Sequence, residues 1–268
     1  MRKNLAAQIP KLSARDLVIL KEVWRYGFRS YDELFDLVLD QYSRSWTWKI
    51  MKRLVRLGYL CERRNEMGKI HGWVGLASPS APDFIKAIRS DVSKRKSPKY
   101  SSSFLHDKEV RGLLDEFRMI SFTRVIRTEP ELRAEILSKI QGYSKRELSE
   151  INSQIPDASV ILEIGADRFK VALEMELNQK TNLRLRKKLE RYSAKSGYDF
   201  VLYVCANKTI FEALMRNYRF VLANSPSIKF AIKKTPIYFT LQSECKGNLL
   251  DALFVSVHDE FKLRKFSK

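Results

Sequence analysis

The first third of the chain alternates between helical and strand-like spacings of hydrophobic residues. Apolar side chains recur every three or four positions in three segments, which predicts helices over residues 12–26, 30–38 and 43–57. Ser13 and Asp16 have the spacing of a capping box at the start of the first helix. Gly58 ends the third helix, and the β-rich segments 59–63 and 70–76 then predict a hairpin.

The remainder of the chain shows a longer alternation of helical and strand patterns. The order is helix, strand, strand, strand, helix, strand, over residues 104–117, 119–127, 158–164, 169–177, 181–194 and 199–205. A charged helix over 130–140 interrupts this order, and a further helix is predicted over 210–222. Strands are also predicted over 227–232 and 236–241, which makes this region an α/β core with a mixed sheet.

The two patterned regions are separated by a segment without apolar periodicity. Residues 93–103 are basic and rich in serine, a composition that favours an exposed linker over a packed element. We therefore expect an α+β chain of two domains. The first covers residues 1–90, a basic linker covers 91–103, and the second domain covers 104–268.

Composition narrows the class of protein. The 268 residues include 50 Lys and Arg against 31 Asp and Glu, a net charge of +19, and a 44% hydrophobic content that excludes a disordered chain. No apolar run approaches the roughly 20 residues of a membrane span, and the first residues lack a signal sequence. We expect a cytoplasmic protein whose partner is a polyanion. A membrane surface is the weaker alternative, because the positive charge is spread over predicted folded elements.

Cysteine and histidine do not indicate a zinc site or a disulfide framework. The chain contains three of each, and none are paired at the spacings typical of metal-binding motifs. No local motif supports catalysis by a Ser-His-Asp or Cys-His group either. The chemistry of a site therefore has to come from other residue types.

The three predicted helices and the hairpin resemble the winged helix-turn-helix family, and residues 54–60 carry the resemblance most clearly. In that family the third helix enters the DNA major groove and the hairpin touches the backbone. The resemblance implies DNA contacts by Arg44, Thr47, Lys49, Lys52, Arg53 and Arg56 on the helix and by Arg63, Arg64 and Lys69 on the hairpin. Arg44 and Thr47 are the candidates for base contacts. Lys49, Lys52 and Arg53 are the candidates for phosphate contacts. A solvated helix face is the alternative interpretation.

A small group of acidic residues interrupts the basic second domain. Asp157 immediately precedes a predicted strand, and Glu174 and Glu176 lie two apart on the next one, so they share a face. Carboxylates in an apolar setting repel each other, and a hard divalent cation offsets that repulsion. Lys180 follows four residues later and can reach back toward them.

At these residues the chain resembles the PD-(D/E)xK, restriction-endonuclease-like superfamily. The matching pieces are Pro156-Asp157 and Glu174-Met175-Glu176 within the order of helices and strands given above. The resemblance implies that Asp157 and Glu174 bind Mg²⁺ or Mn²⁺ and that the catalytic set is Asp157, Glu174, Glu176 and Lys180. Glu176 departs from the family, which has lysine at that position.

The departure leaves several interpretations open. Glu176 is a further ligand and base, or Lys180 supplies the missing ammonium, or the core is degenerate and binds DNA without cutting it. The two glutamates could also form the solvated face of an edge strand, paired with Arg184 or Lys188. Arg184 and Lys188 are otherwise expected to track the DNA backbone. His106 and Glu109 share a helix face and either line the site or only pack.

The combination of a winged helix with this core is similar to the replication-relaxation family and to MobC-type relaxases. The resemblance implies a DNA-binding, metal-dependent endonuclease or nickase that acts in the mobilisation or replication of a plasmid or integrative element. The alternative is a non-catalytic transcriptional regulator or origin-binding protein built on a degenerate nuclease core. We expect double-stranded DNA as the partner, and a homodimer is compatible with the sequence.

Overall fold

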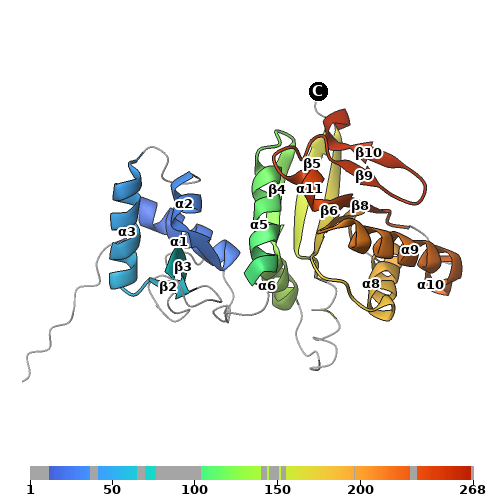
Figure 1. Ribbon diagram of the computed structural model, residues 1–268, viewed down its shortest axis with the longest axis horizontal. Coiled ribbons are helices and arrows are strands. Elements are labelled where there is room, and N and C mark those ends of the chain that lie inside the picture. The colour runs from blue at the N-terminus through green and yellow to red at the C-terminus, as the bar shows by residue number, and fades with distance from the viewer. Residues whose placement is uncertain are drawn as a thin grey trace, which may run out of the picture. The chain divides into compact units, whose positions relative to one another are not determined.

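The computed structural model describes two compact units of the chain (Figure 1). The described residues are 12–36, 42–64, 70–76, 104–139, 144, 151, 155–195, 197–229 and 234–266. The first unit spans Met1–Ser101 and the second spans Ser102–Lys268. Each unit has its own hydrophobic core.

The first unit combines three helices with a three-stranded antiparallel sheet. Its elements are α1 (Ala14–Tyr26), β1 (Phe28–Ser30), α2 (Tyr31–Leu34), α3 (Arg44–Arg56), β2 (Leu60–Arg64) and β3 (Ile70–Leu76). The sheet order is β1-β3-β2. Ile19, Leu20, Met51 and Leu54 are buried between the helices and the sheet, so one apolar stripe of α1 and one of α3 form most of this core.

Local interactions fix where the helices of this unit begin and end. The Ser13 hydroxyl accepts a hydrogen bond from the backbone N–H of Asp16, whose carboxylate accepts one from the N–H of Ser13 at 2.8 Å. Arg53 of α3 also donates to Asp16, which ties α3 to the start of α1. After α3 the chain turns at Gly58, whose φ of +77° is a left-handed conformation that glycine adopts without strain.

The second unit is built on a seven-stranded mixed sheet. The strands are β4 (Thr123–Thr128), β5 (Ala158–Ile164), β6 (Asp167–Glu176), β7 (Phe200–Cys205), β8 (Ile237–Leu241), β9 (Leu253–Val255) and β10 (Glu260–Lys262). Their order is β10-β9-β8-β7-β6-β5-β4. The pairs β6–β7 and β7–β8 are parallel and the other pairs are antiparallel. β6 therefore lies near the middle of the sheet.

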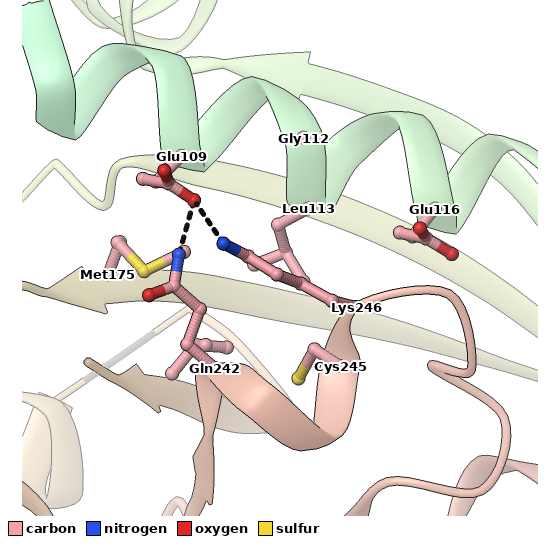
Figure 2. Close-up of a pocket in the computed structure, with 9 residues that line it drawn as sticks. Glu109, Gly112, Leu113, Glu116, Met175, Gln242, Cys245 and Lys246 are labelled. Atoms are coloured by element: carbon pink, nitrogen blue, oxygen red, sulfur yellow. Dashed lines mark hydrogen bonds and ion pairs between the residues drawn. The ribbon is translucent and has the colours of Figure 1, made fainter. Parts of the chain in front are cut away.

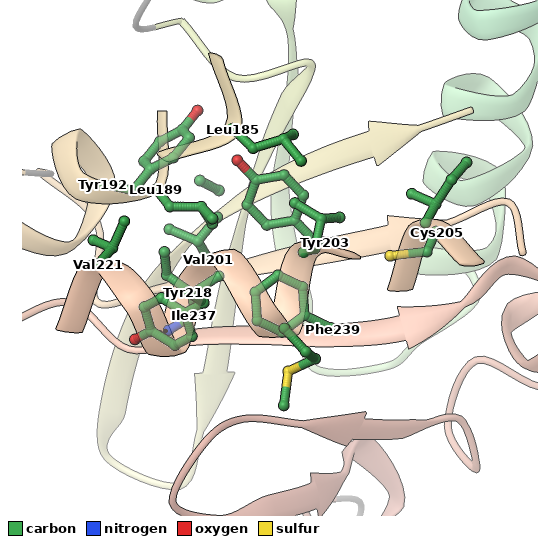
Figure 3. Close-up of a cluster of buried hydrophobic side chains, with 14 of the residues drawn as sticks. Leu185, Leu189, Tyr192, Val201, Tyr203, Cys205, Tyr218, Val221, Ile237 and Phe239 are labelled. Carbon is green, nitrogen blue, oxygen red and sulfur yellow. Dashed lines mark hydrogen bonds between the residues drawn. The ribbon is translucent and has the colours of Figure 1, made fainter. Parts of the chain in front are cut away.

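Helices cover both faces of this sheet. They are α5 (Phe104–Arg118), α6 (Glu129–Lys139), α8 (Asn182–Lys195), α9 (Lys208–Asn224), α10 (Pro226–Lys229) and α11 (Gln242–Cys245). α8 and α9 bury Leu189 and Leu214 against Ala172, Tyr203 and Phe239 of the sheet (Figure 3). Side chains alternate along a strand, so Met175, which lies next to α5 in Figure 2, belongs to the other face, as does Val204, which lines the same pocket.

The structure agrees with most of the elements that the sequence predicts and corrects others. The α+β class with a mixed sheet is confirmed, and so is the helix-strand-strand-strand-helix-strand order with its inserted helix. The strand predicted over 227–232 is wrong, because Pro226–Lys229 form α10, which packs on α8 and α9 through the buried Ile228. The sequence reading missed β1, β9 and β10, which have three residues each.

Within the described residues, no helix combines the length and the apolar character that a membrane crossing requires.

We expect Asp16→Ala to lower the free energy of unfolding of the first unit by about 2 kcal/mol. The substitution removes the reciprocal cap of α1 and leaves Arg53 without its carboxylate, and Asp16 is only 1% exposed. Urea unfolding followed by tryptophan fluorescence measures the loss. Glu33→Ala is the matched control, because Glu33 has the same capping-box position at α2 but is only half-buried. Equal losses for the two variants would contradict the role given to the Asp16–Arg53 pair.

Candidate active site

Asp157 and Glu174 are brought together by the pairing of β5 with β6. In this antiparallel pair Ala158 lies opposite Leu173, so Asp157 falls beside the end of β6 that carries Glu174. Oδ2 of Asp157 accepts a hydrogen bond of 2.7 Å from the backbone N–H of Met175. The predicted neighbourhood of these two carboxylates is therefore present in the structure.

Glu174 is buried and is held by two residues of α8. Its side chain points toward α8 and α9, and the residue is 2% exposed. The ammonium group of Lys188 lies 2.5 Å from Oε2 of Glu174, and the hydroxyl of Tyr192 donates to Oε1. Lys188 and Tyr192 are four residues apart, so one face of α8 supplies both partners.

Glu176 lies on the same face of β6 and has a different partner. It is 3% exposed, and the ammonium group of Lys180 lies 2.6 Å from its Oε2. The segment between β6 and α8 turns back far enough for this contact. Lys180 therefore does reach the acidic group, as the spacing predicts, but the carboxylate that it contacts is Glu176.

His106 of α5 approaches the group beside Asp157. Its Nε2 atom lies 3.2 Å from Oδ2 of Asp157 and 3.1 Å from the carbonyl oxygen of Met175. Both of these atoms are acceptors, so Nε2 carries a proton. Of the two interpretations left open for His106, the structure shows contact with the acidic group rather than packing alone. Glu109, one turn further along α5, instead accepts from Gln242 and lies 3.4 Å from Lys246, in a pocket next to Met175 (Figure 2).

Burial and neighbouring charge shift the pKa values of these groups. Burial raises the pKa of Glu174 to about 7, and the nearby charge of Asp157 adds to the rise, although Lys188 and Tyr192 oppose it. Burial alone would lower the pKa of His106, but the carboxylates of Asp107 and Asp157 outweigh it and raise that pKa to about 10. His106 in turn holds the pKa of Asp157 low despite its burial.

Lys188 is the cation that all three carboxylates share. Burial alone would lower the pKa of its ammonium group, but Glu174, Asp157 and Glu176 together raise it. Each of the three acids thus has a cationic partner: Asp157 has His106, Glu174 has Lys188 and Glu176 has Lys180.

The donor set has the chemistry of a divalent-cation site, with one condition. Asp157, Glu174 and Glu176 supply the carboxylate oxygens that Mg²⁺ and Mn²⁺ prefer. In the described part of the chain, no group of three or more His, Cys, Asp and Glu side chains is gathered in the manner of a metal site. The ammonium group of Lys188 now lies against Oε2 of Glu174, so a cation bound to that oxygen would take its place.

The sequence reading placed some residues of this site incorrectly. β6 is a central strand with both glutamates buried, so the interpretation as a solvated edge strand is wrong. For Lys188 two expectations stood side by side, a contact with the DNA backbone and a salt bridge to the glutamates, and the salt bridge is present, with the ammonium group 2.5 Å from Glu174. The hydrogen bond from Tyr192 was not predicted, and the four-residue spacing of Lys188 and Tyr192 on the helix after β6 is the signal that could have indicated it. Arg184 lies one turn before Lys188 and is exposed.

The residues of α3 that were expected to contact DNA fall into three groups. Thr47 is 2% exposed and donates to the carbonyl of Ser43, so the expectation that it contacts bases is wrong: its position on α3 faces the core. Three of the cations have acidic partners: Arg44 has Asp32, Lys52 has Glu62 and Arg53 has Asp16. Lys49 and Arg56 are exposed, and no partner of either is found among the described residues.

Two of the three hairpin residues that were expected to contact DNA lie on a strand. Arg63 and Arg64 belong to β2, which pairs with β3. Lys69 lies outside the described residues, as do 37–38 of the predicted second helix.

Comparison with known proteins gives no match. Neither a protein-family model, nor a curated protein, nor a solved structure is significantly similar to this chain.

We expect Glu174→Gln to reduce the dependence of the stability of the second unit on pH. The folded pKa of about 7 exceeds the ordinary 4.5, so folding takes up a proton between these pH values. The resulting stabilisation is complete below about pH 4.5 and is lost as the pH rises through 7, a change of about 3 kcal/mol.

Urea unfolding followed by circular dichroism at several pH values measures this effect. Glutamine keeps an oxygen for Lys188 and Tyr192 but does not ionise, so the wild-type protein should lose more stability than the variant between pH 5 and 8 or so. Parallel pH profiles for the two proteins would show that Glu174 does not titrate in this range.

Proposed function

We propose that this protein is a metal-dependent DNA endonuclease or nickase whose active site is formed by Asp157, Glu174 and Lys188. The observation that carries the proposal is the burial of Glu174 beside Asp157, with the ammonium group of Lys188 against it. A charged pair in such a place is a poor stabiliser, because desolvation offsets most of its attraction. A functional requirement accounts for its presence better than stability does.

The arrangement of the elements supports the same proposal. The order of helices and strands around Asp157 and Glu174 is the one on which the resemblance to PD-(D/E)xK nucleases depends. The place of the missing lysine is taken from the helix: Lys188 of α8 contacts Glu174, whereas Lys180 is engaged by Glu176. We therefore assign to Lys188 the role that the sequence suggested for Lys180.

Each residue of the site then has a distinct task. Asp157 and Glu174 would hold Mg²⁺ or Mn²⁺, which acts as a Lewis acid on a phosphodiester and lowers the pKa of a bound water. Lys188, once released from Glu174, offers its ammonium group to the negative phosphate. Tyr192 and His106 position the two carboxylates through hydrogen bonds.

The first unit would deliver this site to DNA. Lys49 and Arg56 are exposed on α3, a helix that precedes a β-hairpin, in keeping with the winged-helix resemblance. Phosphate contacts of this kind give affinity without sequence preference. Action on a plasmid or integrative element and assembly into a homodimer stay predictions from the sequence.

The balance of charges in the site favours a second candidate function. Asp157, Glu174 and Glu176 already have His106, Lys188 and Lys180 as partners, so each of these carboxylates has a counter-charge other than a metal ion. A core of this kind could serve only as scaffold for a DNA-binding regulator or origin-binding protein. Metal binding and cleavage separate the two candidates.

We expect Lys188→Met and Asp157→Asn each to slow metal-dependent cleavage of plasmid DNA by at least about 100-fold. Both substitutions are close in size to the original residue, and circular dichroism checks that the variants fold. Lys262→Met is the matched control, because Lys262 is an exposed lysine of β10 in the same unit and belongs to neither the site nor a proposed DNA surface.

Conversion of supercoiled plasmid to nicked or linear forms with Mg²⁺ or Mn²⁺ provides the readout. Cleavage that survives Asp157→Asn would exclude the proposed active site. No cleavage by the wild-type protein, together with no heat of Mn²⁺ binding, would support the regulator instead.

For the first unit, we expect Lys49→Ala with Arg56→Ala to weaken duplex DNA binding by about tenfold and to lower the slope of log affinity against log salt by almost 2. Lys52→Ala should have a smaller effect on affinity, because Glu62 already neutralises Lys52 at 2.5 Å. Fluorescence anisotropy at several salt concentrations measures both quantities. A loss of affinity in Lys52→Ala as large as in the double variant would show that the Lys52–Glu62 ion pair breaks when DNA binds.

A further inference from the structure

A guanidinium group is stacked on an exposed aromatic ring where α8 and α9 meet. The guanidinium carbon of Arg186 lies 3.6 Å from the centre of the Phe220 ring, which belongs to α9. Phe220 is 43% exposed, an unusual position for so large an apolar side chain. Arg186 is itself partly exposed, so both members of the stack are open to solvent.

A buried amide holds this pair in place. Nε of Arg186 donates to Oδ1 of Asn217 at 2.8 Å, and Asn217 is 1% exposed. The Asn217 amide nitrogen donates in turn to Oδ1 of Asn182 at 2.9 Å and to the carbonyl of Ala213 at 2.8 Å. Arg186 is therefore fixed in its orientation before any ligand arrives, which reduces the entropy lost on binding.

Positive charge surrounds the stacked pair. Four exposed cations lie on the same two helices: Arg184 and Lys187 on α8, and Arg216 and Arg219 on α9. None of the four has an ion-pair partner within the described part of the chain. The acids of these helices are engaged elsewhere: Glu190 accepts from Ser225 and Ser227, and Glu212 lies 3.8 Å from Lys208.

Spacing on the helices places apolar and cationic groups next to each other. Arg216 precedes Phe220 by one turn of α9, and Lys187 follows Leu183 by one turn of α8. Leu183 is 66% exposed. Aromatic and apolar surface interleaved with unpaired cations is the composition of a single-strand binding surface, where bases stack and phosphates meet cations.

We propose that this α8–α9 surface, formed by Arg186, Phe220 and the four cations around them, binds an unpaired single-stranded part of the DNA on which the protein acts. Bases inside a duplex are stacked on one another and cannot reach Phe220, whereas an unpaired base can. The inference rests on the proposed action on DNA and specifies its substrate: a DNA with a single-stranded segment close to the cut. Lys188, which contacts Glu174, is the neighbour of Lys187 on α8, so the same helix carries residues of this surface and of the site.

Binding of labelled oligonucleotides by the full chain, measured by anisotropy in EDTA, tests the proposal without any need for cleavage. We expect Phe220→Ala to weaken binding of a thymidine oligonucleotide by about 5- to 100-fold, and Phe220→Trp to preserve binding. Binding of a blunt duplex should be unchanged in both variants. Met119→Ala is the matched control, because Met119 is 85% exposed in the same unit at the end of α5.

The charges are tested separately. Replacement of Lys187 and Arg216 by alanine should lower the salt slope of single-strand binding by about 0.7 for each phosphate contact removed. Because both residues are exposed, this variant remains informative if Phe220→Ala proves unstable. Thermal unfolding of each variant identifies that case.

Three results would overturn the inference. The first is single-strand binding that neither Phe220→Ala nor the double substitution changes, and the second is an equal loss of duplex binding in these variants. The third is displacement of the oligonucleotide by polyglutamate at equal charge concentration. The last would indicate an acidic protein partner. Loss of cleavage in Asp157→Asn with single-strand binding intact would support both proposals. Single-strand binding without any metal-dependent cleavage would uphold this surface and remove the proposed nuclease.

Discussion

The contact between Glu174 and Lys188 is the interaction around which the candidate site of the second unit is arranged. It joins the central strand β6 to α8 through a buried carboxylate and an ammonium group that is 25% exposed. Burial raises the pKa of Glu174 to about 7, so its carboxylate is ionised only because Lys188 and Tyr192 hold it. An apolar pair at this position would pack without that penalty. The fold therefore keeps a charged pair at this position at some loss of stability.

The same interaction explains how the neighbouring groups are arranged. Lys188 is close enough to Asp157 and Glu176 to feel both charges, so the three acids would repel one another without it. Lys180 and His106 complete the balance from the two flanking elements. A divalent cation between Asp157 and Glu174 would replace the charge of Lys188 and free its ammonium group. In the proposed function, binding of the metal ion at Glu174 and release of the Lys188 ammonium group would therefore occur together.

Sequence patterns predict the frame of this molecule well and its contacts less well. The periodicities of α5, β5, β6 and α8 are strong because each of these elements has one face in a core, and their predicted bounds agree with the structure to within two residues or so. β9 and β10 have three residues each, too few for a period to be visible. Ile228, Phe230 and Ile232 alternate in the manner of a strand, but a proline at the first helical position of Pro226–Lys229 and packing on α8 favour a helix there.

The site divides in the same way between what spacing determines and what folding determines. That Asp157 and Glu174 meet follows from the hairpin of β5 and β6, whose register a sequence can suggest. Which lysine contacts Glu174 depends on how far α8 is rotated against the sheet, and the pattern of leucines at 185 and 189 places Lys188 and Tyr192 on the inner side. Thr47 was assigned to the DNA-facing side of α3 because basic residues surround it in the sequence, but its side chain is buried in the core.

The most direct test of the central claim is a crystal structure of the protein soaked with Mn²⁺. The account predicts an anomalous peak bound by Asp157 and Glu174, with the ammonium group of Lys188 displaced from its 2.5 Å contact with Glu174. A structure without that peak, with Lys188 still in contact with Glu174 and His106 with Asp157, would contradict it.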